Sequence, residues 1–435
     1  MSLKATYHTL GCKLNFAETS AIADMLVKKG IQRASRNETP DLCVVNTCSV
    51  TETADKKARH LIRKLSSQYP EAGIIVTGCY AQLKPQEVAQ LPGVILVLGS
   101  GEKLKISQYI DSWLQFHNPI VETTPSLSLK EFMPSCQRGE RTRYFLKVQD
   151  GCDYFCTYCT IPYARGRSRS GTMAQLTEMA RQAAENGGKE IVLTGVNIGM
   201  FGKDTGEDFF TFLRELDKIE GIERYRISSI EPNLLTEDII SWIAKEARAF
   251  MPHFHIPLQS GSDKVLKLMN RRYDTTLFRS RIDFIRKMMP DAYIGVDIIT
   301  GARGETEEEW LKSFSFAKSL DVTKFHVFPY SERPGTKALQ LGESVPMEER
   351  RHRVQLLNDL SIEKTKRFIA ENKGHTRNVL WEQTSGNSFM RGLTDNYIRV
   401  QAPLKPYLLN EISPVLIGDI NPDDNEIAFA DHILP

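Results

Sequence analysis

Three cysteines lie within eight residues of the stretch "DGCDYFCTYCTIP". They are Cys152, Cys156 and Cys159, with three residues in the first gap and two in the second. Thiolates this close together in a reducing compartment indicate metal ligation or chemistry. Zinc sites usually combine two C-x2-C pairs and four ligands, and the last two cysteines supply only half of that pattern.

No fourth cysteine lies near this triplet. Iron–sulfur clusters are held by cysteine thiolates, and a cubane with three protein ligands leaves one iron open to a substrate or cofactor. The spacing therefore favours such a cluster. The alternative is a zinc site completed by a distant residue, Cys136 or His253.

Three further cysteines each end a short apolar segment: Cys12 after "ATYHTLG", Cys48 after "DLCVVNT" and Cys79 after "GIIVTG". Helical patterns separate these segments, and strand–helix alternation indicates a parallel sheet. Ligands of such sheets gather at the carboxyl ends of the strands, so we expect the three cysteines to meet at one edge as a second cluster site. Cys43 lies mid-strand and is expected to be a buried small hydrophobe; neither it nor Cys136 is expected to be a ligand.

The elements that position these residues form an α/β chain of three domains. Residues 1–120 predict a Rossmann-like open parallel sheet, and residues 121–140, with aperiodic Pro, Ser and Thr, predict a linker. Residues 141–370 hold six apolar strands that end in small or polar residues, as in a barrel whose rim forms the active site. Six units predict an open, partial barrel, and residues 371–435 alternate like a small antiparallel β-barrel.

The composition is that of an ordinary globular protein. The 435 residues are 41% hydrophobic and 25% charged, and the formal net charge is +2. A nucleic-acid surface must therefore be a local patch rather than a global field. No segment approaches the roughly 20 apolar residues of a membrane span, and the first residues do not resemble a signal peptide. We expect a cytoplasmic, monomeric protein with no membrane attachment and with reduced cysteines.

The C-x3-C-x2-C triplet, with Tyr158 before its last member, resembles the signature of the radical S-adenosylmethionine (SAM) enzymes. The resemblance implies a [4Fe–4S] cluster on these cysteines, with the amino and carboxyl groups of SAM on the open iron. It also implies reductive cleavage of SAM to methionine and a 5′-deoxyadenosyl radical. The partial (β/α)6 barrel of those enzymes agrees with the six strands counted above.

The segments "TLGCKLNFAET", "VVNTCSVTETADKKAR" and "TGCYAQ" resemble the three cysteine motifs of the methylthiotransferase domain. This resemblance implies that Cys12, Cys48 and Cys79 hold an auxiliary [4Fe–4S] cluster that presents the sulfur, with a second SAM as methyl donor. The last 65 or so residues resemble a TRAM domain, an RNA-binding β-barrel. Nearly the whole chain is thus similar to the radical SAM methylthiotransferase family.

Within that family, "YHTLGCKLNFAET", "SSIEP" and "FHVFPYSERPGTKA" are most similar to the MtaB type. The resemblance implies that the substrate is N6-threonylcarbamoyladenosine at position 37 of the tRNA anticodon stem-loop. It also implies an electron donor of the flavodoxin or ferredoxin type and a sulfur source. The isopentenyladenosine type is the first alternative and a ribosomal-protein aspartate the second. A non-catalytic, zinc-stabilised RNA-binding protein is the alternative from another class.

Several residues after the barrel strands carry weaker expectations. The resemblance implies that Gly195 and Asn197 contact SAM, and that Ser228, Glu231 and Gln259 contact SAM or the substrate. Glu231 is alternatively an ordinary rim carboxylate that pairs with Arg226 or Arg272. The loop "GARGET" has Ala302 and Arg303 where the family commonly has Phe-Pro. Arg303 is expected either to contact the nucleotide or to be a solvated side chain.

Basic groups predict RNA contacts at two places, the helix around "DKKARHLIRKL" and the segment "YARGRSRSG". A solvated helix face is the alternative for the first group. Residues 371–435 carry a net charge of −4, from five Lys/Arg and nine Asp/Glu, so RNA binding there must use local patches or stacking by Phe389, Tyr397 and Trp381. The basic candidates are Lys56, Arg59, Arg63, Arg165, Arg167 and Arg169.

Overall fold

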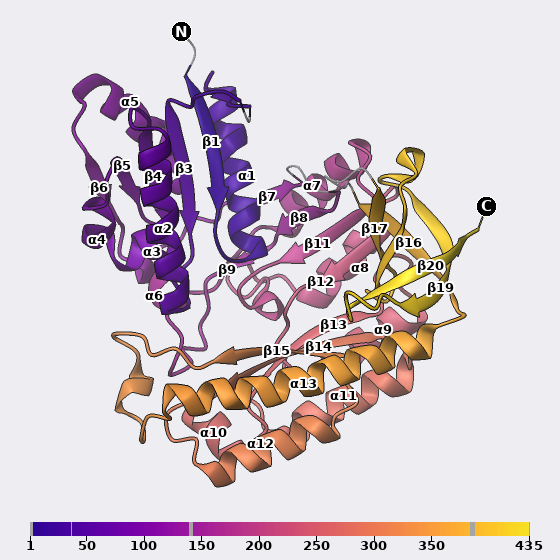
Figure 1. The fold of residues 1–435 in the computed structure, drawn as a ribbon. Coiled ribbons are helices and arrows are strands. Elements are labelled where there is room, and N and C mark those ends of the chain that lie inside the picture. The colour runs from indigo at the N-terminus through magenta and orange to yellow at the C-terminus, as the bar shows by residue number, and fades with distance from the viewer. Residues whose placement is uncertain (1–2, 36, 139–141, 383–387, 435) are drawn as a thin grey trace.

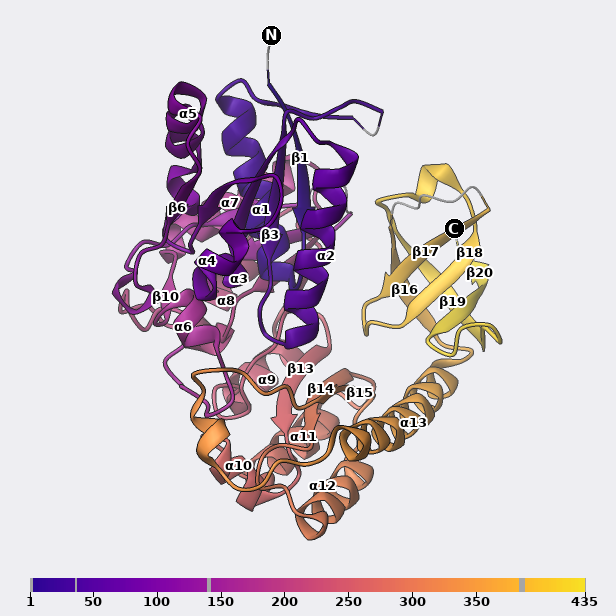
Figure 2. The ribbon, with the colours of Figure 1, turned by 60° about the vertical axis from the view of Figure 1, so that its left-hand side comes forward.

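A computed structural model describes residues 3–35, 37–138, 142–382 and 388–434 of the chain. Figure 1 shows an N-terminal domain and a C-terminal barrel on either side of a central domain. Figure 2 shows that the two outer domains stand apart from each other, with β13, β14 and β15 below them. The long helix α13 (Met347–Asn372) leads from the central domain to the C-terminal barrel.

The N-terminal domain is a six-stranded parallel sheet in the order β2-β1-β3-β4-β5-β6. The three strands that precede the separated cysteines are immediate neighbours in it, so the expected meeting of their carboxyl ends is observed. The strands are β1 (Lys4–Thr9), β2 (Gln32–Arg33), β3 (Leu42–Thr47), β4 (Gly73–Gly78), β5 (Val94–Leu98) and β6 (Ile120–Glu122). The helices are α1 (Lys13–Lys28), α2 (Glu52–Gln68), α3 (Cys79–Leu83), α4 (Pro85–Ala89), η1 (Glu102–Lys105) and α5 (Ile106–Phe116).

The central domain is the expected partial barrel of six strands in chain order. Hydrogen-bonded parallel pairs join β8 to β11 to β12 and β13 to β14 to β15. Only the isolated bridges Tyr225–Phe250 and Ser229–His255 connect the two halves, and no described pairing closes β15 onto β8. The strands are β8 (Tyr144–Lys147), β11 (Glu190–Thr194), β12 (Arg224–Ile227), β13 (His253–Gln259), β14 (Tyr293–Thr300) and β15 (Lys324–Pro329).

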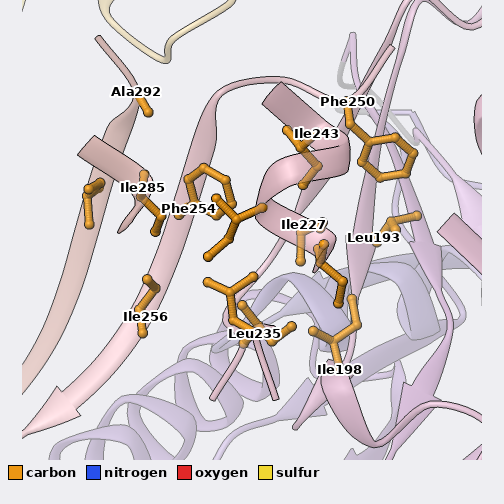
Figure 3. Packing of buried hydrophobic residues seen from close by; sticks show 14 of the residues in the cluster. Leu193, Ile198, Ile227, Leu235, Ile243, Phe250, Phe254, Ile256, Ile285 and Ala292 are labelled. Carbon is orange, nitrogen blue, oxygen red and sulfur yellow. The ribbon is translucent and has the colours of Figure 1, made fainter. Parts of the chain in front are cut away.

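The helices of the central domain from α7 onward cover the outer face of these strands. Side chains alternate across a strand, so Phe254 and Ile256 of β13 enter the core against the helices while His253 and His255 face the other way. Figure 3 shows part of this core, with Leu193, Ile227 and Ile256 contributed by different strands. The helices are α6 (Ile161–Arg165), α7 (Met173–Glu185), α8 (Phe209–Asp217), α9 (Glu237–Lys245), α10 (Asp263–Leu268), α11 (Thr275–Met288) and α12 (Glu307–Ser319).

The segment expected to be a plain linker contributes to both neighbouring sheets. Its first residues extend β6 at the edge of the N-terminal sheet. Further along, β7 (Ser135–Gln137) pairs antiparallel with β8 and begins the central sheet. The connection is therefore built into the two domains.

The C-terminal domain is a closed five-stranded barrel in the order β16-β17-β18-β20-β19. Its pairs are antiparallel, as expected, except that β18 and β20 run parallel. None of the described helices of the chain combines the length and the apolar composition that a membrane crossing requires. The strands are β16 (Thr376–Glu382), β17 (Phe389–Thr394), β18 (Arg399–Pro403), β19 (Ile412–Ile420) and β20 (Ile427–Ile433).

Two candidate cysteine sites and the residues between them

The compact triplet lies in the loop between β9 (Gln149–Asp150) and α6, where every sulfur receives a hydrogen-bond donor. The backbone N–H of Tyr154 donates to Cys152 Sγ at 3.4 Å, and that of Ile161 to Cys159 Sγ at 3.4 Å. Arg271 Nη1 donates to Cys156 Sγ at 3.2 Å. Donors of this kind stabilise sulfur in its anionic, metal-binding form.

Burial acts in the opposite direction on the same thiols. It raises the pKa of each of them, that of Cys159 to about 12. The free side chains are therefore neutral at pH 7. A metal group bound here would replace these protons, and the preplaced donors would stabilise the resulting thiolate charge.

The second triplet is assembled from three strand ends. Cys12 caps α1, Cys48 follows β3, and Cys79 begins α3 directly after β4. Gly11 has φ +100°, and a Cβ there would stand 2.5 Å from Cys48 Cβ, so the first two loops touch and require glycine. Burial, together with the neighbouring Cys79 and Cys12 thiols, raises the pKa of Cys48 to about 12.

The two triplets are not placed to hold a single metal ion. Among the described residues, no group of three or more His, Cys, Asp or Glu side chains meets that condition. The ligands of a zinc site all bind one atom, whereas the three cysteines of a cubane would bind three different irons.

A buried network of charged side chains connects the two triplets. Arg165 of α6 is 1% exposed, and its Nη1 contacts Glu18 of α1 at 2.9 Å and Asp150 at 3.0 Å. It also donates to Asn15, which binds the backbone oxygens of Leu10 and Thr47 beside Cys12 and Cys48. Asp150 in turn accepts from the N–H of Gly151 at 2.8 Å, directly before Cys152.

The network carries more positive than negative charge. Burial opposes ionisation of Glu18, but Arg165, Lys103 and Lys147 hold its pKa well below the usual range. With Arg169 and Asp150 added, four buried cations face two buried carboxylates. Interior positive charge of this kind calls for a nearby anion, and Arg165 acts electrostatically on both Cys48 and Cys79.

The loop expected to contact SAM is held against the compact triplet by Gln149, which the sequence patterns did not single out. Its Oε1 accepts from the N–H groups of Val196 and Asn197 at 3.0 and 2.9 Å, and its Nε2 donates to Gly151 O at 2.8 Å. A Cβ at Gly195 would stand 3.0 Å from the same Oε1. Asn197 Nδ2 lies 3.9 Å from Cys152 Sγ.

Two polar atoms beside this loop are buried without a hydrogen-bond partner among the described residues. They are Asn197 Oδ1 and Ser228 Oγ. Buried polar atoms are rarely left unpaired, so both are suited to bind a ligand. Gln259 ends β13 at a break in register and has φ +65°, a strained conformation for a non-glycine residue.

Two regions of the chain match known families: residues 4–99 match "Uncharacterized protein family UPF0004", and residues 146–317 match the "Radical SAM superfamily". The threonylcarbamoyladenosine tRNA methylthiotransferase MtaB of Bacillus subtilis (strain 168) is 38% identical over 402 residues, 91% of this chain and 89% of that protein. The chain belongs to the radical SAM methylthiotransferase family.

Other relatives of this methylthiotransferase carry two kinds of name. The MtaB protein of Aquifex aeolicus (strain VF5) is 36% identical and covers 92% of this chain and 96% of its own length. A "tRNA-2-methylthio-N(6)-dimethylallyladenosine synthase" of Pelotomaculum thermopropionicum is 31% identical, with 94% of this chain and 93% of that protein covered. The radical SAM methyltransferase TsrM from Kitasatospora setae shares the fold, with a TM-score of 0.57 at 14% identity over 78% of this chain and 77% of that one.

Glu231 of the methylthiotransferase is paired, but with neither of the partners considered for it. Its carboxylate contacts Arg271, the residue that also contacts Cys156. Arg226 instead pairs with Glu190 at 2.9 Å, and Arg272 lies over the ring of Tyr154, 4.1 Å from its centroid. Burial raises the pKa of Glu231 although Arg271 opposes the shift.

The prediction of RNA contacts is wrong for two of the three arginines after the compact triplet. Arg165 and Arg169 are 1% and 6% exposed and pair with buried carboxylates, so neither reaches solvent. Arg167 is exposed, with Asp153 at 3.8 Å. On α2, Lys56 and Arg63 are exposed, whereas Arg59 pairs with Glu52 and Glu87.

The aromatic candidates of the C-terminal barrel divide in the same way. Trp381 is fully buried and donates to Ser413 Oγ at 2.8 Å, so its prediction as a stacking residue is wrong. Tyr397 packs on His253, with 4.2 Å between ring centroids, and belongs to the contact between the domains. Phe389 is 51% exposed and remains available for stacking.

The departure from the family pattern at Ala302 and Arg303 has a structural explanation. Ala302 is buried against Val265 and Met269. Arg303 pairs with Glu332 at 2.9 Å and donates to a backbone oxygen, so it is neither a free cation nor a simply solvated one. Cys43 is fully buried within the N-terminal core, as expected.

Proposed function

We propose that this chain methylthiolates C2 of N6-threonylcarbamoyladenosine at position 37 of tRNA. The observation that carries the proposal is the 38% identity to an MtaB protein over 91% of the chain. Both cysteine triplets that the chemistry requires lie within the regions that match family models, residues 4–99 and 146–317. Isopentenyladenosine 37 is the second candidate, because a relative named for the dimethylallyl nucleoside is 31% identical over 94% of the chain.

In this proposal Cys152, Cys156 and Cys159 hold one [4Fe–4S] cluster and Cys12, Cys48 and Cys79 hold the other. Each triplet leaves one iron without a protein ligand. When bound, the first cluster with SAM supplies a carbon radical that opens the non-acidic C2–H bond, and the second supplies the methylated sulfur. No side-chain base of the protein is required at C2, because that proton is not acidic.

The protein's own residues hold and orient these groups. Gln149 keeps the Gly195–Asn197 loop against the compact triplet, and the free Asn197 Oδ1 and Ser228 Oγ are offered to SAM. Tyr158, Glu231 and Gln259 complete the proposed SAM or substrate contacts. The excess positive charge around Arg165 supports an anionic cluster on the N-terminal triplet.

The proposed partners follow from the same chemistry. The substrate is the anticodon stem-loop of a tRNA, and the C-terminal barrel is proposed to act as a TRAM domain, with Phe389 exposed for base stacking. Lys56, Arg63 and Arg167 are the exposed basic side chains proposed to contact phosphate. An electron donor of the flavodoxin or ferredoxin type and a sulfur source are also required.

Nucleoside mass spectrometry of tRNA from cells with and without this protein tests the substrate. The proposal expects loss of the 2-methylthio group from the threonylcarbamoyl nucleoside, whereas loss from the isopentenyl nucleoside would overturn it. Iron and sulfide analysis after anaerobic reconstitution tests the cofactors. Two [4Fe–4S] clusters require about eight irons and eight sulfides per chain, and about one zinc per chain would contradict the proposal.

A further inference from the structure

A cavity of about 300 Å³ lies where all three domains meet. It is bounded by the start of α1, the inner face of β13 to β15, α13 and the C-terminal barrel. In Figure 2 the N-terminal domain and the C-terminal barrel stand apart above these strands. The cavity is separate from both cysteine triplets, and no role described above uses it.

The cavity is lined by cations that its carboxylates do not balance. Lys13, Lys324 and Arg399 line it, and Glu426 is the only carboxylate among the lining residues. Glu426 pairs with both Lys324 and Arg399. Lys13 is exposed and belongs to none of the ion pairs among the described residues, so its charge is available to a ligand at the cavity.

A buried histidine adds a second, independent sign of a missing ligand. His253 lines the cavity, is 6% exposed, and has no hydrogen-bond partner for Nδ1 among the described residues. The rings of Tyr293 and Tyr397 pack on either side of it, with 5.5 and 4.2 Å between centroids. The cavity therefore offers a polar atom and a cation next to aromatic surface.

Two links connect the cavity with the residues around the proposed cluster sites. Lys13 directly follows Cys12 in the chain. On the other side, His255 lines the cavity and contacts Asp297 at 2.7 Å, and Asp297 is close enough to Glu231 to act on its charge. The cavity therefore adjoins residues that are connected with both proposed sites.

We propose that this cavity binds the threonyl group of the substrate nucleoside, with Lys13 as the main contact of its carboxylate. The inference rests on the proposed function and names Lys13 as the residue that recognises the threonylcarbamoyl group already present on the base. The threonyl group combines a carboxylate with a methyl and a hydroxyl group, which suits a cationic cavity with aromatic walls. An uncharged prenyl group would leave the Lys13 charge without a partner, so the same cavity disfavours the isopentenyl nucleoside.

The test compares two anticodon stem-loop RNAs that differ only at the carboxylate. One carries threonylcarbamoyladenosine, and the other carries its neutral carboxamide. Their affinities for the reconstituted enzyme are measured by fluorescence anisotropy at one salt concentration, since phosphate contacts depend on salt. A charge-assisted hydrogen bond is worth about 1.5–3 kcal/mol, so the wild type is expected to bind the acid about 10- to 150-fold more tightly.

Three variants locate that preference. Lys13→Met is expected to bind the two RNAs equally, because it loses affinity for the acid alone. Lys13→Arg keeps the charge and is expected to keep most of the preference. Lys287→Met, an exposed lysine of α11 away from the cavity, serves as the matched control and is expected to behave as the wild type.

The other outcomes separate this inference from the proposed function. Equal binding of both RNAs by a wild type that methylthiolates the acid form overturns the cavity assignment and leaves the function intact. Loss of affinity for both RNAs in Lys13→Met makes Lys13 a phosphate contact and also overturns it. A wild type that modifies only an isopentenyladenosine stem-loop overturns the proposed function itself, and the threonyl site with it.

Discussion

The two cysteine triplets of this chain are built in opposite ways. Cys152, Cys156 and Cys159 share one loop, and the donors to their sulfurs come mostly from that loop and from Arg271. Cys12, Cys48 and Cys79 come from three neighbouring strand ends and depend on the whole sheet. The first site is local and the second is a property of the N-terminal fold and of its contact with the barrel.

The two sites also differ in the pKa of the carboxylate that lies next to each of them. Glu18, behind the N-terminal triplet, faces three cations that outweigh its burial and hold its pKa well below the usual range. Glu231, behind the barrel triplet, has one close cation, and burial raises its pKa. The cations around Glu18 favour its charged form, whereas burial disfavours the charged form of Glu231.

The largest effect is expected from removing one cysteine of each triplet. Cys152→Ala should abolish SAM cleavage, because it removes a ligand of the cluster proposed to cleave SAM. Cys48→Ala should retain some uncoupled cleavage but lose methylthiolation. Chromatographic measurement of 5′-deoxyadenosine and of the methylthiolated nucleoside separates the two outcomes. Equal loss of cleavage in both variants, with both well folded, would contradict the division of labour.

The next largest effect is expected at the buried network. Glu18→Gln removes the anion that Arg165, Lys103 and Lys147 share, and breaking a buried ion pair costs about 3–5 kcal/mol of stability. Asp24→Asn, on the exposed part of the same helix, breaks only the surface pair with Arg33 and is the matched control. Denaturant unfolding measures both, and a Glu18→Gln curve that coincides with the control would show that the interface does not need the charge.

The sequence revealed what is local. Each strand that ends in Cys12, Cys48 or Cys79 is a short apolar run before a helix, so their shared edge followed from the alternation of strands and helices. The compact triplet was visible from its spacing alone. The six strands of the barrel were visible because each one is apolar over its own length.

The partners of buried charges were not visible, because they come from distant parts of the chain. "YARGRSRSG" has the composition of a solvated basic segment, yet Arg165 is buried by Glu18, 147 residues away in sequence. Glu231 meets Arg271, 40 residues further on, rather than the two arginines considered for it. Trp381 is enclosed by the closure of a barrel, which no single strand encodes.

A smaller effect is expected in the pH dependence of stability, to which Glu18 and Glu231 contribute with opposite signs. The folded pKa of Glu18 is lowered, so its stabilisation is complete above the usual glutamate pKa and is lost as the pH falls below it. The folded pKa of Glu231 is raised, so its contribution is greatest at low pH and declines as the pH rises through that value. We therefore expect the loss of unfolding free energy in Glu18→Gln to become smaller as the pH falls. The unfolding free energy of Glu231→Gln should rise relative to the wild type as the pH increases. Unfolding curves at several pH values check this, and slopes of the same sign would contradict it.

The smallest effect is expected at the surfaces next to the two sites. Arg167 lies beside the barrel triplet and Lys56 on the α2 helix of the N-terminal domain, and both are exposed. If each contacts one phosphate, substitution by alanine should weaken RNA binding a few-fold and reduce the slope of log affinity against log salt by about 1. Arg167 already has Asp153 at 3.8 Å, so its loss should cost less than that of an unpaired lysine. Salt titrations of stem-loop binding decide whether Lys56 contacts phosphate or belongs to a solvated helix face. An unchanged slope in Lys56→Ala would show that α2 faces solvent, and the RNA contacts would then lie on the barrel side.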